Sequence, residues 1–225
     1  FIATLDDIAW LFNLRGADVS FNPVFVSFAL ISQQQATLFV ALSKVDEALR
    51  AQLEVDGVSL RDYSEVSAAL QAVPEGVALQ IDPARVTAGL LEHLNPGVKL
   101  LEGLNPTTLA KSRKSLADAE HIRQAMEQDG AALCEFFAWL DSALGRERIT
   151  ELTIDERLTA AREQRPGYVS LSFNTIAAFN ANGAMPHYHA TPEEHAVIEG
   201  DGLLLIDSGG QYLGGTTDIT RMVPV

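Results

Sequence analysis

Short apolar runs alternate with amphipathic segments over roughly the first half of the chain. This alternation predicts a sheet with helices packed on it. Asp82-Pro83 and Asn95-Pro96 mark expected helix boundaries, because proline suits a first helical turn and disfavours a helix just before itself. The segments expected to form strands are Phe1–Leu5, Val24–Ser32, Ala36–Leu42, Ala78–Ile81 and Val98–Leu101, and those expected to form helices are Asp7–Asn13, Val45–Glu54, Ser64–Ala72 and Pro83–Leu94.

A different pattern begins after a break at Gly103–Thr107. From Ser115 onward apolar residues recur at roughly helical period, which predicts one long amphipathic helix. Ser115 and Asp118 suit the N-terminal cap of this helix. The change of pattern at the break predicts two domains, residues 1–102 and residues 103–225.

The second domain is expected to continue with a shorter helix and several strands. Thr153 and Glu156 have the spacing of a capping box and predict a helix over Ile154–Glu163. Strand-like alternation returns in Tyr168–Phe173. Two further segments, residues 202–207 and 216–223, run from apolar to polar and are separated by glycines. The mixture of helices and strands predicts an α/β (α+β) fold class.

Composition and charge narrow the classes of partner. Thirty acidic residues against sixteen Lys and Arg give a formal net charge of −14, which repels phosphate backbones and anionic membrane surfaces. We therefore expect no nucleic-acid partner. The apolar stretches are too short and too interrupted to span a bilayer, so no membrane partner is expected either. Cys134 is the one cysteine; with no disulfide to form, a cytoplasmic location fits best.

Two aspartates stand out near the carboxy-terminal end. The segments that carry Asp207 and Asp218 flank a turn containing Gly214-Gly215, so a β-hairpin is the natural geometry. Across such a hairpin the two carboxylates are direct or diagonal neighbours, with Cβ atoms roughly 5 to 8 Å apart. Like charges at this separation repel, and a divalent cation between them removes the repulsion. The alternative is that both aspartates cap turns in an ordinary hairpin, a frequent role for Asp beside Gly.

The sequence around the two aspartates closely resembles the pita-bread metallopeptidases, most specifically the multidomain aminopeptidases P. The resemblance is strong over residues 1–32 and 116–225 and weak between them. The runs that carry it are Ile206-Asp-Ser-Gly-Gly-Gln-Tyr212, Gly215-Thr-Thr-Asp-Ile-Thr-Arg221, Leu5-Asp-Asp-Ile-Ala-Trp-Leu-Phe-Asn-Leu-Arg-Gly16, Asn22-Pro-Val-Phe25, His121-Ile-Arg123, Asp129-Gly-Ala-Ala-Leu-Cys134 and Asn182-Gly-Ala-Met-Pro-His-Tyr188.

The resemblance implies a fold, a metal centre and a reaction. The implied fold is a creatinase-like mixed-sheet domain followed by the first half of a pita-bread catalytic domain. In the family the first aspartate binds one metal ion and the second bridges a pair, which gives these roles to Asp207 and Asp218. The implied cofactors are two divalent ions, Mn²⁺ foremost, with Zn²⁺ and Co²⁺ as alternatives. The implied reaction is hydrolysis of the bond between an amino-terminal residue and a following proline, with a homodimer as the frequent assembly.

His187 is a further candidate site residue. By resemblance it is a catalytic histidine that contacts the substrate rather than a metal ligand. The alternative is a loop histidine with no role, and that alternative is favoured for His189 and His195. Trp10 is expected in the core, and Arg15 is expected to pair with an acid or to face the last carbonyls of the first helix.

The family's metal centre needs five ligands: two aspartates, a histidine and two glutamates that follow further on. None of the five histidines lies beyond Asp218, so we expect this chain alone to be inactive. Because the chain starts at Phe1 without Met, we also expect the true amino terminus to lie upstream. Two other functions stay open, namely a prolidase or creatinase-like hydrolase and a pita-bread module that binds peptides or proteins without catalysis.

Overall fold

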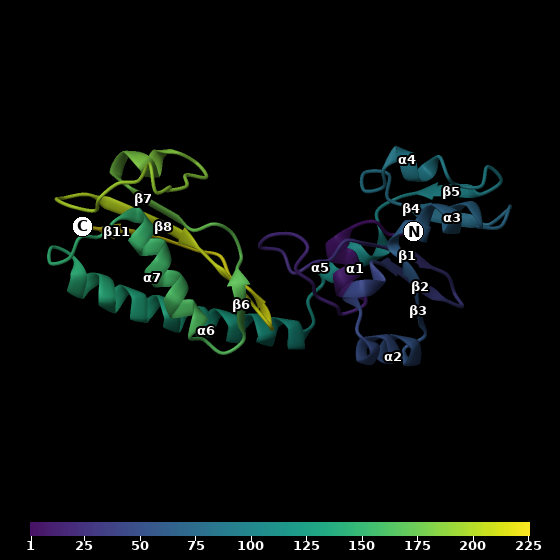
Figure 1. Ribbon diagram of the computed structural model, residues 1–225, viewed down its shortest axis with the longest axis horizontal. Helices are drawn as coiled ribbons and strands as arrows, with labels where there is room; N and C mark the ends of the chain where they lie inside the picture. Colours follow the sequence, from purple (N-terminus) through teal and green to yellow (C-terminus); the bar gives the residue numbers. More distant parts are fainter. The chain divides into compact units, whose positions relative to one another are not determined.

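The computed structural model describes residues 1–225, and the chain folds into two compact units, Phe1–Arg113 and Lys114–Val225 (Figure 1). Helices and strands occur together in both units, so the predicted α/β (α+β) class is confirmed. The predicted domain boundary after residue 102 falls just before α5 (Pro106–Ser112), which packs against α1 (Leu5–Leu11). That boundary stays a prediction about where the two domains meet.

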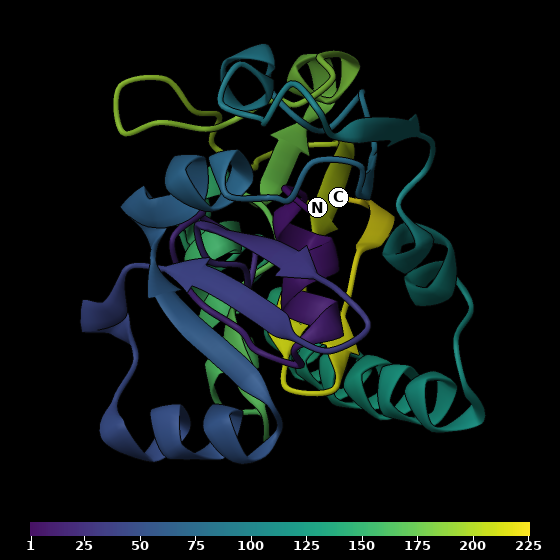
Figure 2. The ribbon, with the colours of Figure 1, turned by 90° about the vertical axis from the view of Figure 1, so that its right-hand side faces the viewer.

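Unit 1 contains two small sheets. In the first, β1 pairs with β2 antiparallel and β2 pairs with β3 parallel, so that the three strands lie side by side (Figure 2). The second consists of two parallel strands, β4 and β5. The bounds of these strands are β1 Ser27–Ile31, β2 Ala36–Val40, β3 Val58–Asp62, β4 Ala78–Ile81 and β5 Lys99–Glu102.

The remaining helices of unit 1 connect these strands. Parallel strands need a crossover, and α2 (Glu47–Val55) supplies it between β2 and β3. The side chain of Asp46 caps α2 by accepting a 2.8 Å hydrogen bond from the backbone N–H of Leu49. Gly57 then turns the chain into β3 with φ of +76°, which glycine adopts without a steric penalty. The other elements are α3 Val66–Gln71, α4 Ala88–Leu91 and the 3₁₀ turns Leu42–Lys44 and Tyr63–Glu65.

Two predicted elements of unit 1 are wrong. The strand over Phe1–Leu5 is reduced to one bridge between Ile2 and Ala29, because the helix already begins at Leu5 with two aspartates in its first turn. The helix over Pro83–Leu94 is reduced to α4. The side chain of Asp82 accepts a hydrogen bond from the N–H of Ala84 and holds the first residues in a turn instead.

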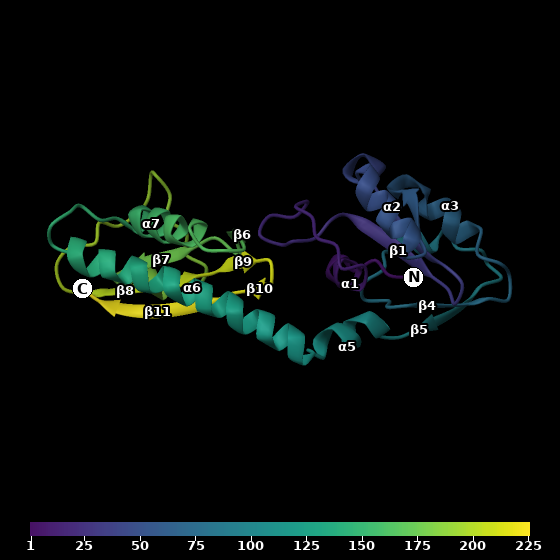
Figure 3. The ribbon, with the colours of Figure 1, turned by 90° about the horizontal axis from the view of Figure 1, so that it is seen from below.

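Unit 2 is built from two long helices on one face of a sheet. α6 (Leu116–Ala143) and α7 (Glu151–Glu163) pack together and cover the sheet of order β11–β8–β7 (Figure 3). A smaller antiparallel sheet of order β10–β9–β6 continues from it. The strands are β6 Tyr168–Leu171, β7 Ile176–Phe179, β8 Leu203–Ser208, β9 Gly210–Tyr212, β10 Gly215–Thr216 and β11 Ile219–Pro224, and a 3₁₀ turn spans Asn180–Ala184.

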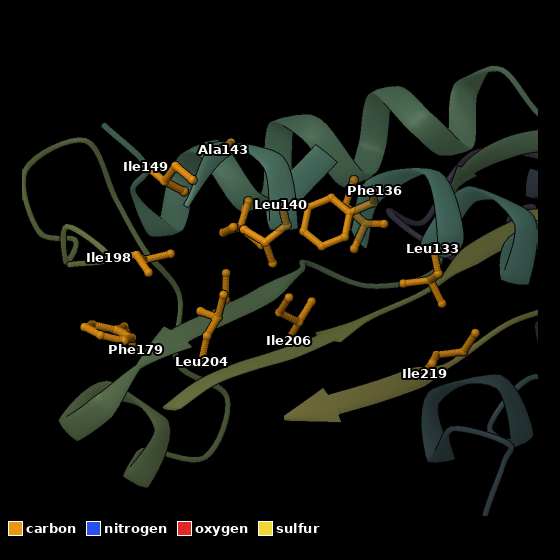
Figure 4. Close-up of a cluster of buried hydrophobic side chains, with 13 residues drawn as sticks. Leu133, Phe136, Leu140, Ala143, Ile149, Phe179, Ile198, Leu204, Ile206 and Ile219 are labelled. Atoms are coloured by element: carbon orange, nitrogen blue, oxygen red, sulfur yellow. The ribbon is translucent and has the colours of Figure 1, made fainter. Parts of the chain in front are cut away.

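The core of unit 2 lies between α6, α7 and this sheet. Figure 4 shows Leu140 and Phe136 of α6 facing Leu204 and Ile206 of β8. Leu204 is fully buried, as are Ile154 and Leu158 of α7. Burying each side chain of this size stabilises a fold by about 1.5 to 3 kcal/mol. The alternation along β8 thus fixes which of its side chains face the helices.

The two helix caps of unit 2 differ in how well the sequence predicts them. The capping box of Ser115 and Asp118 at the start of α6 is confirmed. For α7 the predicted box of Thr153 and Glu156 is wrong. Thr150 is the cap residue instead, and its hydroxyl accepts from the N–H of Thr153, so that the helix begins three residues before the predicted position.

Candidate metal centre

Asp207 lies on the face of the sheet that α6 and α7 do not cover. Side chains alternate along a strand, so Leu204, Ile206 and Ser208 are buried while Asp207 is half-buried on the other face. Thr220 lies directly opposite on β11, and its hydroxyl donates a 2.9 Å hydrogen bond to Oδ1 of Asp207. This bond orients the carboxylate on the surface of the sheet.

A pocket of about 290 Å³ opens over this carboxylate. It is lined by Asp207 and Thr220, by apolar residues of β7 and β8, and by the loop that follows β7. His187 belongs to that loop and lines the same pocket with an exposed side chain. The structure therefore brings together two of the three predicted site residues, which are separated by twenty positions in the sequence. The lining residues are Ile176, Ala178, Gly183, Ala184, Met185, Pro186, His187, Leu205, Asp207 and Thr220.

Asp218 lies outside the lining of this pocket. It is exposed and sits between β10 and β11. The register pairs Asp207 with Thr220 and Ser208 with Ile219, so Asp218 is diagonal to Asp207 rather than directly opposite it. The hairpin itself is confirmed, although its arms leave the larger sheet at Gly209 and pair again as β9 and β10.

Glu151 organises the loop that carries His187. This carboxylate is fully buried at the start of α7 and has no cation beside it. It accepts hydrogen bonds of 2.7 Å from the N–H groups of Phe179 and Ala196, which lie at opposite ends of the loop. The amide of Asn182 and the hydroxyl of Tyr188 donate to it at 2.9 and 2.7 Å. Glu151 therefore holds the two ends of the loop together through hydrogen bonds to its buried carboxylate.

The pKa values agree with a charged Glu151 and a neutral Tyr188. Burial alone would raise the pKa of Glu151, but the hydrogen bonds from Ala196, Phe179, Asn182 and Tyr188 outweigh burial, and the pKa is lowered. Burial, followed by the hydrogen bond to Glu151, raises the pKa of Tyr188 to about 12. Near neutral pH the hydroxyl of Tyr188 thus stays protonated and acts as the hydrogen-bond donor to Glu151.

The loop holds His187 in a strained backbone conformation. Its φ is +59°, a region that residues other than glycine seldom adopt. Such strain costs of order 1 to 3 kcal/mol and persists only where surrounding contacts enforce it. The adjacent Tyr188, bonded to Glu151, is one such contact.

The other residues singled out in the sequence have structural surroundings. His189 is exposed and does not line the pocket, and Nδ1 of His195 lies 2.9 Å from the carbonyl oxygen of Thr191. Nη1 of Arg15 donates a 2.9 Å hydrogen bond to the carbonyl oxygen of Ala9 in the last turn of α1. Of the two predicted alternatives for Arg15, the structure therefore supports the one in which it faces the last carbonyls of this helix. The core position predicted for Trp10 is wrong. Its side chain is 38% exposed, because Ile8 and Ala9 fill the buried side of α1.

Asp207 and Asp218 suit a hard divalent cation by the chemistry of their oxygen donors. They do not form a complete site by themselves. In residues 1–225 no group of three or more His, Cys, Asp or Glu side chains could hold a metal ion. A metal bound to the two aspartates therefore needs further ligands.

Family comparisons agree with this arrangement of two units. Residues 1–118 match the creatinase/prolidase N-terminal domain, and residues 120–225 match metallopeptidase family M24. The chain belongs to the creatinase/prolidase N-terminal domain family through residues 1–118, and its second unit is similar to the M24 metallopeptidases. Both halves of the predicted fold, the creatinase-like domain and the part of a pita-bread domain, are thereby confirmed.

Similar curated relatives are named Xaa-Pro aminopeptidases. A probable Xaa-Pro aminopeptidase P of Botryotinia fuckeliana is 39% identical in an alignment that covers 98% of this chain and 35% of the relative. Xaa-Pro aminopeptidase 1 of Dictyostelium discoideum is also 39% identical, over 98% of this chain and 35% of its own length. The chain thus spans about a third of the curated relatives that it matches.

Solved structures show the same fold. The X-prolyl aminopeptidase of Caenorhabditis elegans, described as a cytosolic enzyme with a di-nuclear active site, superposes with a TM-score of 0.87 at 30% identity. The match covers 97% of this chain and 37% of that protein. An Xaa-Pro dipeptidase from Bacillus anthracis has a TM-score of 0.73 at 20% identity, over 98% of this chain and 58% of that one, and shares the fold. No helix of this chain is long and apolar enough to cross a membrane.

Proposed function

We propose that the protein containing this chain is a metal-dependent aminopeptidase that hydrolyses the bond between an amino-terminal residue and a following proline. The observation that carries the proposal is the pocket in which His187 and Asp207 meet. The relatives named Xaa-Pro aminopeptidase, which match nearly the whole of this chain, support the same activity.

Asp207 and Asp218 would hold the metal, Asp207 as a terminal ligand and Asp218 as a bridging one. The hydrogen bond from Thr220 fixes the orientation of the Asp207 carboxylate before a metal binds. Two divalent ions, Mn²⁺ foremost, would polarise the peptide carbonyl of the substrate. They would also lower the pKa of water, so that hydroxide is available near neutral pH. The di-nuclear site described for the Caenorhabditis elegans protein supports this number of ions.

His187 would bind the peptide. Its imidazole is exposed on the pocket side of the loop and is available to hydrogen-bond a peptide carbonyl or the oxyanion formed from it. A peptide nitrogen that belongs to proline has no hydrogen to donate. Recognition of proline must therefore come from the shape of its ring, and the apolar lining by Ile176, Ala178 and Leu205 offers contacts of that kind.

The test uses the full-length protein and a synthetic Xaa-Pro-Xaa peptide with added Mn²⁺. Release of the first residue is expected, and Asp218→Asn should abolish it together with most of the bound metal. Asp201→Asn is the matched control, because Asp201 is an exposed aspartate of the same unit that lies outside the pocket. A full-length Asp218→Asn protein that keeps both activity and metal contradicts the assignment.

Substrate length separates this activity from that of a prolidase. An aminopeptidase should cleave a tripeptide with proline in second place at least as well as an Xaa-Pro dipeptide. Cleavage of the dipeptide alone would show a dipeptidase instead, the activity named for the Bacillus anthracis structure. Binding of both peptides without hydrolysis would show a non-catalytic module.

The proposal extends to the isolated chain, its location and its assembly. Residues 1–225 alone should bind metal weakly and cleave neither peptide, because they supply only two of the proposed carboxylate ligands. A cytoplasmic location follows from the lone Cys134 and is supported by the description of the Caenorhabditis elegans protein as cytosolic.

The homodimer implied by resemblance stays a prediction, which sedimentation of the full-length protein checks.

A further inference from the structure

A fully buried ion pair lies beneath the sheet that carries Asp207. Asp129 of α6 and Arg162 of α7 both have side chains with 0% exposure. Nε of Arg162 donates to Oδ1 of Asp129 at 2.6 Å, and Nη2 donates to Oδ2 at 3.2 Å. Two charges buried in this way lose their hydration, and apolar residues of similar volume often stabilise a fold equally well. Packing alone therefore does not account for the pair.

The ion pair also forms hydrogen bonds with three residues that lie in β8, in β9 and in the segment before β11. Tyr212 donates its hydroxyl proton to Oδ1 of Asp129 at 2.9 Å, and Thr217 donates to Oδ2 at 2.8 Å. Nη2 of Arg162 donates to the hydroxyl of Ser208 at 3.1 Å. These three hydrogen bonds connect the two helices with the end of β8, with β9 and with the segment before β11.

Two of these three residues are direct neighbours of the proposed metal ligands. Ser208 follows Asp207, and Thr217 precedes Asp218. Ser208 and Thr217 are fully buried, whereas Asp207 is half-buried and Asp218 exposed. Each pair of neighbours therefore has one side chain bonded to the ion pair and the other directed away from the core.

Thr217 is held at every polar atom. Its N–H donates to the carbonyl of Gly210 at 2.9 Å, and its hydroxyl oxygen accepts from the N–H of Gly210 at 2.8 Å. The carbonyl of Thr217 accepts from the hydroxyl of Ser172 at 2.8 Å. With the bond to Asp129, the residue before Asp218 has little freedom to move.

We propose that the Asp129–Arg162 pair is a positioning device that sets the spacing of the Asp207 and Asp218 carboxylates and thereby the metal affinity of the site. The inference rests on the proposed function, because it takes these two aspartates as ligands. Asp129 and Arg162 touch neither the metal nor the substrate in this account, and they act through Ser208 and Thr217.

The test compares two substitutions of one residue in the full-length protein. Thr217→Val keeps the shape of the side chain and removes its hydroxyl, whereas Thr217→Ser keeps the hydroxyl. Titration with Mn²⁺ should show affinity lowered about 10-fold or more in Thr217→Val, as for other residues that orient metal ligands. Thr217→Ser should recover most of this loss. Equal affinity in Thr217→Val and the unmodified protein would overturn the proposal.

A control for general destabilisation is Leu140→Ala, which removes a core side chain of α6 that does not bond to the ion pair. It should lower the melting temperature and leave Mn²⁺ affinity unchanged at temperatures where the protein is folded. If Leu140→Ala lost as much Mn²⁺ affinity as Thr217→Val, the ion pair would act only by stabilising the fold. Tyr212→Phe serves if Thr217→Val does not fold, and it should lower affinity by removing one bond to Asp129.

Asp218→Asn separates this proposal from the proposed function. If Asp218→Asn keeps its metal, the ligand assignment is wrong and the proposed function fails with it. If Asp218→Asn loses metal and Thr217→Val does not, only the positioning role is wrong. If both lose metal, with recovery in Thr217→Ser, both are supported.

Discussion

The hydroxyl of Tyr188 donates a 2.7 Å hydrogen bond to Oε2 of Glu151, and this bond ties the residue after His187 to the first turn of α7. Glu151 is buried without a cation, so its charge depends on donors of this kind. The conformation of the proposed substrate-binding loop is therefore coupled to one carboxylate inside the unit.

Tyr188→Phe should loosen this loop without emptying any space. A hydrogen bond to a charged group contributes about 1.5 to 3 kcal/mol, and we expect a loss of stability of this size in unit 2. Hydrogen exchange of residues 180–196 should become faster, and kcat/KM of the full-length protein should fall. A variant with unchanged exchange in this segment would show that the other donors hold the loop without Tyr188.

The pH dependence of stability should identify Glu151. Its pKa is lowered below the ordinary value of 4.5 in the folded protein. The ionised carboxylate therefore stabilises the fold fully above that value, and this contribution is lost as the pH falls through the lower folded pKa. At pH 7 Glu151→Gln should have a lower melting temperature than the unmodified protein. On acidification its melting temperature should fall by less than that of the unmodified protein. Glu156→Gln, an exposed change on the same helix, should keep the dependence of the unmodified protein.

The start of α7 can be tested by two substitutions. Thr150→Ala should cost about 1 kcal/mol, because the hydroxyl of Thr150 caps the helix. Glu156→Ala should change stability by a few tenths of a kcal/mol, since Glu156 is exposed in the second turn of the helix. Chemical unfolding of both variants measures the difference. A larger loss of unfolding free energy in Glu156→Ala than in Thr150→Ala would support the capping box of Thr153 and Glu156 that the sequence predicts.

Gly209 should not tolerate a side chain. A Cβ atom there would lie 2.0 Å from the carbonyl oxygen of Thr217 and 2.3 Å from the hydroxyl of Ser172. Gly209→Ala should therefore displace Thr217, destabilise unit 2 and lower Mn²⁺ binding by the full-length protein. Gly130→Ala is the matched control, since nothing lies within 4 Å of a Cβ atom at that helical position. It should stabilise α6 by about 0.5 to 1 kcal/mol.

Local signals explain which parts of the fold the sequence predicts. The capping box at Ser115 and the glycines between Asp207 and Asp218 act within a few residues, and the helix and hairpin follow from them. The sequence analysis does not predict β3 and β7, and the pairing of both strands depends on partners that lie far away in the sequence. The pairing of β7 with β8 is also what places the loop of His187 beside Asp207.

The polar groups inside unit 2 also escaped prediction. Asp129 does carry a signal, because it lies one helical turn from Ala125 and one from Leu133 on the buried side of α6. A charged residue in that position calls for a buried partner. The sequence does not identify the partner, since Arg162 lies on another helix and resembles any exposed arginine of a helix end. Glu151 is hidden in the same way at the first position of α7.

The alternation of side chains along β8 has a consequence for how this segment tolerates changes in length. Deleting or inserting one residue between Leu204 and Ile206 would move every later residue of the strand to the opposite face. The carboxylate would then enter the apolar space beneath α6, and Ile206 would face solvent. Natural relatives and engineered variants should therefore vary in length in the loop between His189 and Gly200, and not within this strand.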